Sequence, residues 1–274
     1  MLLKGKPVAD AIINEIKLDY PHYRPTLALV RVGDNPDDIA YEKNIIKKAK
    51  EVGVNVQQTA LISNEQTDYW ELKAVLENIK NTDYINGMLL FRPLPPNIEK
   101  VFNSVKYSIS PNQDIDGLLP NSPFYPCTAM ACYEILKYYN IPIEGKNVVV
   151  IGRSETIGKP AADLLLNENA TVTVCHSKTP NIKEYTLKAD IVIVAVGKAN
   201  MFDKSYFNED CTVIDVGINF DENGKMCGDV AVEVADKVAN ITPVPGGVGS
   251  VTTSVLMKNL YKARKGRQNE INRH

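Results

Sequence analysis

Four lysines lie within one short predicted helix, the segment AYEKNIIKKAKEVG at residues 40–53. A lysine shielded from water can act as an acid or a base, and Tyr41 at the start of the segment adds a polar hydroxyl. Lysine-rich helix surfaces are nevertheless common and usually solvated, and a lone tyrosine on an amphipathic helix more often lies at the rim of a core. The segment by itself leaves both a catalytic role and a plain surface role open.

A phosphate-binding pattern occurs in VVVIGRSETIGKPAADLLL at residues 148–166, which predicts a strand, a tight turn and a helix. Gly152 permits the sharp turn, and Gly158 lets the first helical turn approach the sheet. The backbone N–H groups between them then face outward and can bind an anion such as pyrophosphate. Because Ser154 replaces the middle glycine of a G-x-G-x-x-G pattern, the match is weak by itself, and a purely structural turn is the alternative.

The next predicted strand, TVTVCHS at residues 171–177, ends where the adenosine ribose of a dinucleotide would lie. An NAD enzyme typically has an acid at this position, whereas this chain offers His176, Ser177 and Lys178. Together with Arg153, these donors suit a 2′-phosphate, which favours NADP as the cofactor, with NAD as the alternative. In the competing interpretation, Arg153 and Lys178 are ordinary surface cations and His176 caps a strand end.

An acidic DIDG segment at residues 114–117 lies in a long predicted loop at residues 108–128. Loops of this length are usually functional or connect two domains, so the loop predicts a domain boundary. Asp116 has no evident packing role and is a candidate ligand-binding carboxylate. The alternative is an acid that only caps a helix or shapes a turn.

The composition predicts a folded protein that binds small molecules. The chain has 274 residues, of which 44% are apolar, and a formal net charge of −2. This charge gives no field that would gather nucleic acid or an anionic membrane, and no apolar run is long enough for a signal peptide or a membrane span. We therefore expect a cytoplasmic protein. The five cysteines form no C-x-x-C pair, so neither disulfides nor a metal site is expected.

Two series of alternating strand and helix patterns must position these residues. The first series has apolar strand patterns at residues 26–33, 54–62 and 85–91, and helix patterns at 7–18, 40–53 and 64–80. The second has β-branched, apolar runs at 147–152, 171–177, 189–197 and 211–219, and ends in a helix from Thr252 to about Arg264. Such alternation predicts an α/β fold with mostly parallel sheets.

Four segments in this order, VVVIGRSETIGKP, TVTVCHSKT, VIDVGIN and ITPVPGGVG, follow the DIDG loop and closely resemble the methylenetetrahydrofolate dehydrogenase/cyclohydrolase family of FolD-like enzymes. The resemblance extends from GKPVADAI, near the start of the chain, to the last helix. It implies a two-domain α/β subunit that forms a homodimer. The folate-binding catalytic domain would comprise residues 1–120, with a C-terminal helix at 252–266 packed on it, and a Rossmann-type NADP-binding domain would comprise residues 121–251.

The resemblance also implies an activity and a set of site residues. Members oxidise 5,10-methylenetetrahydrofolate with NAD(P)⁺ and hydrolyse the methenyl product to 10-formyltetrahydrofolate. Tyr41 resembles the tyrosine that flanks the folate, and Asp116 resembles the aspartate that binds the pterin; these are the expected catalytic residues. The expected substrate-binding loop near the nicotinamide is Pro245, Gly246 and Gly247. The expected cofactor-binding residues are Gly152, Arg153, Ser154, Ile157, Gly158, His176, Ser177 and Ile218.

Two positions depart from the family pattern. The family has a lysine four residues after the tyrosine, where this chain has Ile45, and a glutamine that contacts this lysine, where this chain has Phe91. Hydride transfer needs no protein base, whereas hydration of the methenyl cation gains from general acid–base catalysis. Lys48 and Arg92 are the candidate replacements, although strand alternation turns Arg92 away and arginine is a poor base.

The sequence therefore predicts an NADP-dependent methylenetetrahydrofolate dehydrogenase with weak or absent cyclohydrolase activity. One alternative is a fully bifunctional enzyme that uses another acid–base residue. Another is a catalytically silent protein that binds folate and nucleotide. A non-folate NADP dehydrogenase of similar build is disfavoured by the DIDG and TPVPGGVG segments.

Overall fold

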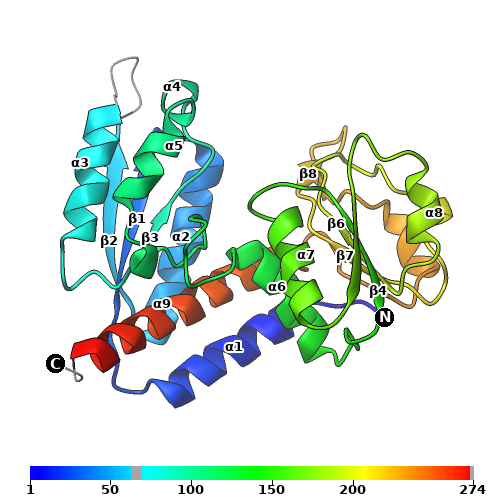
Figure 1. The fold of residues 1–274 in the computed structure, drawn as a ribbon, viewed down its shortest axis with the longest axis horizontal. Helices are drawn as coiled ribbons and strands as arrows, with labels where there is room; N and C mark the ends of the chain where they lie inside the picture. Colours follow the sequence, from blue (N-terminus) through cyan, green and yellow to red (C-terminus); the bar gives the residue numbers. More distant parts are fainter. Residues whose placement is uncertain (63–68, 272–274) are drawn as a thin grey trace. The chain divides into compact units, whose positions relative to one another are not determined.

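The computed structural model describes residues 1–62 and 69–271, with side chains described as far as residue 263 (Figure 1). The chain divides into two compact units. Unit 1 comprises Met1–Ala11 and Tyr125–Val255, and unit 2 comprises Ile12–Phe124 and the chain from Leu256 onward. Helix α1 (Gly5–Asp19) and the last helix, α9 (Gly249–Ile271), each contribute residues to both units.

Unit 2 is built on a three-stranded sheet in the order β2-β1-β3, and both pairings are parallel. The strands are β1 (Thr26–Val32), β2 (Asn55–Leu61) and β3 (Gly87–Leu90). Its helices are α2 (Pro36–Val52), α3 (Tyr69–Lys80), α4 (Pro96–Glu99) and α5 (Phe102–Val105). Each predicted strand and helix of the first series is present, and the predicted helix at 64–80 is observed from Tyr69, since residues 64–68 lie outside the described part.

Strand β1 has helices on both of its faces, because its side chains alternate between them. Ala28, Val30 and Val32 belong to a core that includes Leu72, Leu76 and Ile79 of α3. The other face, which carries Leu27, Leu29 and Arg31, is buried as well, and α2 lies on this side of the sheet (Figure 1). This explains why β1 reads as a continuous apolar run rather than an alternating one.

Local sequence fixes both ends of α2. The Asn35 side chain accepts a hydrogen bond from the N–H of Asp37 at 3.0 Å, and Pro36 occupies the first helical turn. Gly53 ends the helix in the left-handed region, with φ +80°, and its N–H donates to carbonyls of the last turn. The helix buries Glu42, Ile45, Ala49 and Val52 as one stripe.

Two later segments are tied into unit 2 by buried side-chain amides. In the predicted loop at 108–128, the Gln113 amide donates to the carbonyls of Ile79 and Ile85 at 3.1 and 3.0 Å. In α9, the Asn259 amide donates to the carbonyl of Ile115 at 2.9 Å, and the Tyr261 hydroxyl donates to that of Val52. The segment around Asp116 is therefore held from both sides rather than freely extended.

Unit 1 contains a five-stranded parallel sheet in the order β10-β7-β6-β4-β5. The strands are β4 (Asn147–Ile151), β5 (Thr171–Cys175), β6 (Ile191–Val194), β7 (Thr212–Asp215) and β10 (Asn240–Ile241), with a small antiparallel hairpin of β8 (Asn219–Phe220) and β9 (Met226–Cys227). Its helices are α6 (Cys127–Tyr138), α7 (Gly158–Asn167) and α8 (Ile182–Thr186). Strand order reverses at β4, so β4 and its neighbours end at a topological switch point.

Two buried aspartates hold the loops that follow the strands of unit 1. The Asp215 carboxylate accepts hydrogen bonds from the N–H groups of Gly217, Asp229 and Val230. The Asp229 carboxylate accepts from those of Val196, Gly197 and Lys198. Burial raises the pKa of Asp215 to about 6, although its hydrogen bonds act in the opposite direction.

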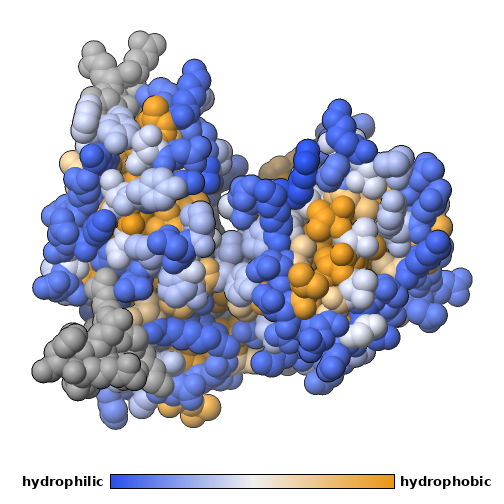
Figure 2. All heavy atoms as spheres, in the orientation of Figure 1, coloured by the Kyte–Doolittle hydropathy of each residue, from blue (hydrophilic) through white to orange (hydrophobic). Residues whose placement is uncertain are grey.

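The visible surface is mostly hydrophilic (Figure 2). Hydrophilic residues cover most of the visible surface of each unit, and smaller apolar patches lie among these residues (Figure 2). None of the helices in the described part of the chain combines the length and apolar character that a bilayer crossing requires.

We predict that Asp215 makes stability depend on pH in a defined direction. Its folded-state pKa, about 6, lies above the ordinary value of 3.8, so the folded protein binds this proton more tightly than the unfolded chain. The stabilisation of the folded state by this proton is complete below about pH 4 and is lost as pH rises through 6. The free energy of unfolding should change by on the order of 3 kcal/mol. Urea unfolding from pH 4 to 7 should therefore show the stability of the native protein falling relative to Asp215→Asn, which does not titrate there. A difference that is constant with pH would contradict the prediction.

Candidate functional site

The predicted folate side of unit 2 is an aromatic and apolar surface at the ends of β1 and β3. The rings of Tyr41 and Phe91 meet edge to face, with centroids 6.0 Å apart and an interplanar angle of 78°. Ile45, one helical turn after Tyr41, is completely buried. The positions that differ from the family pattern are therefore occupied by two apolar side chains, next to the half-buried Tyr41.

Both candidate replacement cations are held by other partners. The Lys48 ammonium forms an ion pair with Glu51 at 3.0 Å. The Arg92 guanidinium pairs with Glu99 and lies 4.2 Å from the ring centroid of Phe102. Phe102 belongs to the core on the α3 side of the sheet, so Arg92 points to the face opposite Tyr41, as strand alternation predicts.

A buried ion pair lies beneath α2, and sequence reasoning did not find it. Arg31 of β1 and Glu42 of α2 are 8% and 6% exposed, and their Nε and Oε2 atoms are 3.5 Å apart. Asp34 approaches the same guanidinium at 2.8 Å, and its hydrogen bond is the main reason that the pKa of Arg31 is raised. The available signal was an arginine inside the apolar run TLALVRV, which requires a buried acid nearby.

The two acids of the DIDG segment have different surroundings. Asp114 is 2% exposed, and its carboxylate accepts from the N–H groups of Leu118 and Leu119 at 3.0 and 2.7 Å. Burial raises the pKa of Asp114 despite these bonds. Asp116 is only half-buried. Asp114 therefore shapes the turn, and Asp116 is the acid of this segment that a ligand could reach.

In unit 1, the turn between β4 and α7 requires glycine at both predicted positions. Gly152 has φ +126°, and a Cβ there would lie 2.2 Å from the carbonyl oxygen of Ala195. A Cβ on Gly158 would lie 2.3 Å from the carbonyl oxygen of Gly152. Helix α7 can therefore begin directly against the turn, which leaves a cradle of backbone of the kind that binds phosphate.

Ser154 occupies part of the hydrogen-bonding capacity of this cradle. Its hydroxyl accepts hydrogen bonds from the N–H groups of Ile157 and Gly158, at 3.2 and 3.3 Å. Two of the N–H groups that we expected to face an anion are thus already satisfied by the chain itself, because serine supplies an acceptor that glycine lacks. Arg153, which is exposed in the same turn, is the remaining positive group there.

The turn after β5 lies next to this cradle, since the Gly152 N–H donates to the Cys175 carbonyl at 2.9 Å. His176 Nδ1 accepts from the N–H of Lys178 at 3.1 Å, so the neutral ring carries its proton on Nε2. Ser177 and Lys178 are exposed in the same turn. His176 therefore organises the strand end and leaves its Nε2–H as a donor in the same place, so the structure is compatible with both interpretations of this residue.

The predicted nicotinamide loop is also built from close backbone contacts. Gly246 has φ +99°, and its carbonyl accepts from the N–H of Gly5 at 2.8 Å. A Cβ on Gly247 would lie 2.5 Å from the carbonyl oxygen of Pro243. Ile218, which is 63% exposed, lies beside this loop, because its Cδ1 is 3.8 Å from where a Cβ on Gly249 would be. Pro245 is exposed at the tip.

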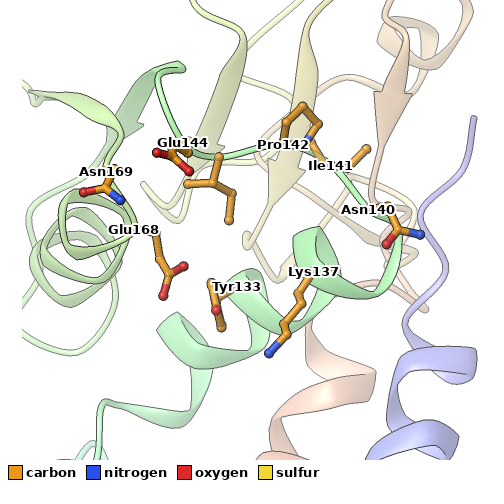
Figure 3. Close-up of a pocket in the computed structure, with 9 residues that line it drawn as sticks. Tyr133, Lys137, Asn140, Ile141, Pro142, Glu144, Glu168 and Asn169 are labelled. Carbon is orange, nitrogen blue, oxygen red and sulfur yellow. The ribbon is translucent and has the colours of Figure 1, made fainter.

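A surface pocket of about 430 Å³ lies elsewhere in unit 1 (Figure 3). It is lined by Tyr133, Lys137, Asn140–Glu144, Glu168 and Asn169, none of which the sequence pattern assigns to a ligand. Among the residues that the structure describes, no group of three His, Cys, Asp or Glu side chains could hold a metal ion. Burial raises the pKa of both Cys132 and Cys211 to about 12, so these thiols stay protonated.

Comparison with known proteins assigns both parts of the chain to one family. Residues 3–116 match the catalytic domain of the tetrahydrofolate dehydrogenase/cyclohydrolase family, and residues 126–268 match its NAD(P)-binding domain. The chain is 43% identical to the bifunctional protein FolD of Clostridioides difficile, over 98% of each chain. The chain belongs to this family. Membership confirms both the resemblance noted in the sequence and the predicted α/β fold class with a catalytic and an NAD(P)-binding domain.

Solved structures of family members have the same fold. The FolD methylenetetrahydrofolate dehydrogenase/cyclohydrolase of Campylobacter jejuni matches with a TM-score of 0.91 and 39% identity, covering 97% of this chain and 99% of that chain. The FolD of Trypanosoma brucei, solved with NADP and an inhibitor, matches with a TM-score of 0.88 and 34% identity, covering 97% and 98%.

We predict that Gly158→Ala weakens both unit 1 and its nucleotide binding. The added Cβ must push α7 away from the backbone of Gly152, which we expect to cost about 1–3 kcal/mol of unfolding free energy. Denaturant unfolding and a fluorescence titration with NADP⁺ measure the two effects. The matched control is Gly249→Ala, whose Cβ would have its nearest neighbour at 3.8 Å and should change neither value. Equal behaviour of the two variants would contradict the prediction.

Proposed function

We propose that this protein is an NADP-dependent 5,10-methylenetetrahydrofolate dehydrogenase whose methenyl cyclohydrolase activity is weak or absent. The observation that carries the proposal is the apolar contact of Tyr41 with Phe91 beside the buried Ile45. The family pattern implies a lysine ammonium at position 45 and a glutamine amide at position 91. Neither side chain present there can carry a proton.

The proposed folate side of unit 2 uses Tyr41 and Asp116. Tyr41 would stack beside the folate, held in place by the Phe91 ring. Asp116 would accept hydrogen bonds from the amino and ring N–H groups of the pterin, because a carboxylate suits such a pair of donors. The Asp114 carboxylate, by fixing the turn, would set the position of Asp116.

The proposed cofactor side fits NADP. The cradle formed by Gly152, Ser154, Ile157 and Gly158 has no room for larger side chains at either glycine. Arg153, His176 and Ser177 supply donors for a 2′-phosphate, and no acid of the kind that binds a ribose 2′-hydroxyl occupies the end of β5. NADP⁺ would supply the hydride acceptor, and Ile218 with Pro245, Gly246 and Gly247 would bound its nicotinamide end.

The two reactions of the family make different demands on the protein. Hydride leaves the methylene carbon with help from the lone pairs of the folate nitrogens, so the protein chiefly has to hold the reactants at contact distance. Hydration requires a water molecule to lose a proton, and general acid–base catalysis typically contributes about 10²–10⁴-fold. Loss of a proton carrier should therefore reduce hydration far more than oxidation.

The bifunctional alternative requires another acid–base residue, and the silent-binder alternative requires a defective cofactor side. The ion pairs of Lys48 and Arg92 argue against either as the replacement. The intact glycine cradle argues against a silent protein.

The same proposal includes a folate-binding domain of residues 1–120 with 252–266 and an NADP-binding domain of residues 121–251. It also includes a homodimer in the cytoplasm, and light scattering would measure the number of subunits.

We predict that purified protein with methylenetetrahydrofolate and NADP⁺ produces methenyl absorbance that persists. The same assay with NAD⁺ should be slower, because the donors for the 2′-phosphate find no partner. Lys48→Ala and Arg92→Ala should each change both rates by no more than about 2-fold, in keeping with exposed ion pairs. Rapid enzyme-dependent decay to the formyl product, abolished in one of these variants, would establish the bifunctional alternative instead. Folate and NADP⁺ binding without turnover would establish the silent one.

We also predict that restoring the family pair restores hydration. The double variant Ile45→Lys with Phe91→Gln should hydrate methenyltetrahydrofolate at least about 10-fold faster than the native protein, because it regains an acid–base group and its amide partner. The matched control is Ile46→Lys with Phe91→Gln, which places the same charge about 100° around the helix. If both double variants hydrate at the native rate while still binding folate, the loss of this pair does not explain the missing activity.

A further inference from the structure

Asp38 lies on the same face of α2 as Tyr41, the proposed folate-binding residue of this helix. It precedes Tyr41 by three positions and Ile45 by seven, and residues at these spacings share one face of a helix. Asp38 is half-buried, as Tyr41 is, and belongs to the first turn, whereas Ile45 is buried one turn further along. The carboxylate therefore sits one turn before Tyr41, at the end of the stripe that covers β1.

Neither the Asp38 carboxylate nor that of the exposed Asp37 accepts a hydrogen bond within the part of the chain that the structure describes, whereas other acids of unit 2 have partners. Asp34 and Glu42 pair with Arg31, and Asp114 accepts from backbone N–H groups. Burial raises the pKa of Asp38, the charge of Asp37 acts in the same direction, and the charge of Arg31 opposes both. A partly desolvated carboxylate without a hydrogen-bond donor destabilises the fold. Folding stability therefore does not explain why an acid occupies position 38.

The ordinary role of an acid in a first helical turn does not account for Asp38. Acids there stabilise the helix macrodipole, and they do so fully when exposed to solvent. Asp37, its neighbour in the same turn, is exposed and meets that description. Asp38 differs in its half burial and in sharing the face of Tyr41.

The cations near this face offset the charge of Asp38 only in part. Arg31 lowers the pKa of Asp38, but its single positive charge also pairs with Asp34 and Glu42, at 2.8 and 3.5 Å. Lys48 is paired with Glu51, and Arg92 with Glu99 on the opposite face of the sheet. With Ile45 in place of the family lysine, the helix face beside Tyr41 carries a negative charge where the family pattern implies a positive one.

The proposed oxidation changes the charge of the folate. The C–H bond of the methylene carbon breaks, both electrons leave with the hydrogen as hydride to the nicotinamide, and the carbon is left as a methenyl cation shared by its two nitrogens. No proton moves in this step. A nearby fixed negative charge stabilises the cation and the transition state that leads to it, but not the neutral substrate.

We propose that Asp38 is a specificity-determining residue that selects the cationic methenyl form of the folate and so favours oxidation. The inference rests on the proposed function. The preference for the cation has two sources. Ile45 replaces the family lysine, which would repel a cation, and the Asp38 carboxylate attracts one.

The test compares a cationic and a neutral folate in two variants. Fluorescence titrations measure the binding of methenyltetrahydrofolate and of tetrahydrofolate to the native protein, Asp38→Asn and Asp37→Asn. Asp38→Asn should weaken binding of the cation by about 3- to 10-fold, the scale of one partly screened charge, and leave tetrahydrofolate unchanged. Its kcat for oxidation should fall by a similar factor with KM unchanged. Asp37→Asn, which removes an equal charge from the exposed side, should change none of these values.

The other outcomes distinguish failure of this inference from failure of the proposed function. Equal weakening of both folates would mean that Asp38 acts only through structure, and equal behaviour of the two variants would mean that general charge is responsible. No folate binding by the native protein would remove both this inference and the proposed function. Native binding without turnover would refute the dehydrogenase alone, because the ratio of the two affinities still reports on Asp38. Unfolding of each variant is followed in parallel, so that a loss of fold is recognised as such.

Discussion

The proposed chemistry depends on the contact of Tyr41 with Phe91 above the sheet of unit 2. Beside Tyr41, a fully buried Ile45 and the Phe91 ring lie where the family pattern implies a lysine and its amide partner. A charge is stable in such surroundings only with a hydrogen-bonded partner, and both are replaced together. The apolar replacement is therefore self-consistent: removing only one member of the pair would have left a buried polar group unpaired.

Both units place their candidate residues at the carboxyl ends of parallel strands. Phe91 and Arg31 lie at the ends of β3 and β1, and Gly152 and His176 follow β4 and β5. At these ends the chain leaves the hydrogen-bonded sheet, and helix N-termini with their N–H groups begin. The buried acids Asp114, Asp215 and Asp229 fix the loops there by accepting backbone N–H groups that no strand or helix satisfies.

Regular patterns made most of the fold predictable. The apolar runs of β1, β4, β6 and β7 stand out because strands buried on both faces contain almost no polar residues. The two glycines of the β4–α7 turn were also predictable, since backbone contacts of 2.2–2.3 Å to a Cβ exclude every other residue. Two features were not. The capping of α7 by Ser154 depends on a rotamer, and the Arg31–Glu42 pair joins residues on different elements.

The sequence by itself determined which elements form, where the glycine turns lie and which family positions are missing a proton carrier, because these depend on local spacing and residue type. Only the tertiary structure decided which charges remain available. It showed Lys48 and Arg92 held by Glu51 and Glu99 and Asp114 committed to a turn. It also showed Asp38 on the face of Tyr41, where no described residue donates a hydrogen bond to it. Spacing along one helix or strand cannot settle this, because the partner of a charge is chosen by packing between elements that are distant in the chain.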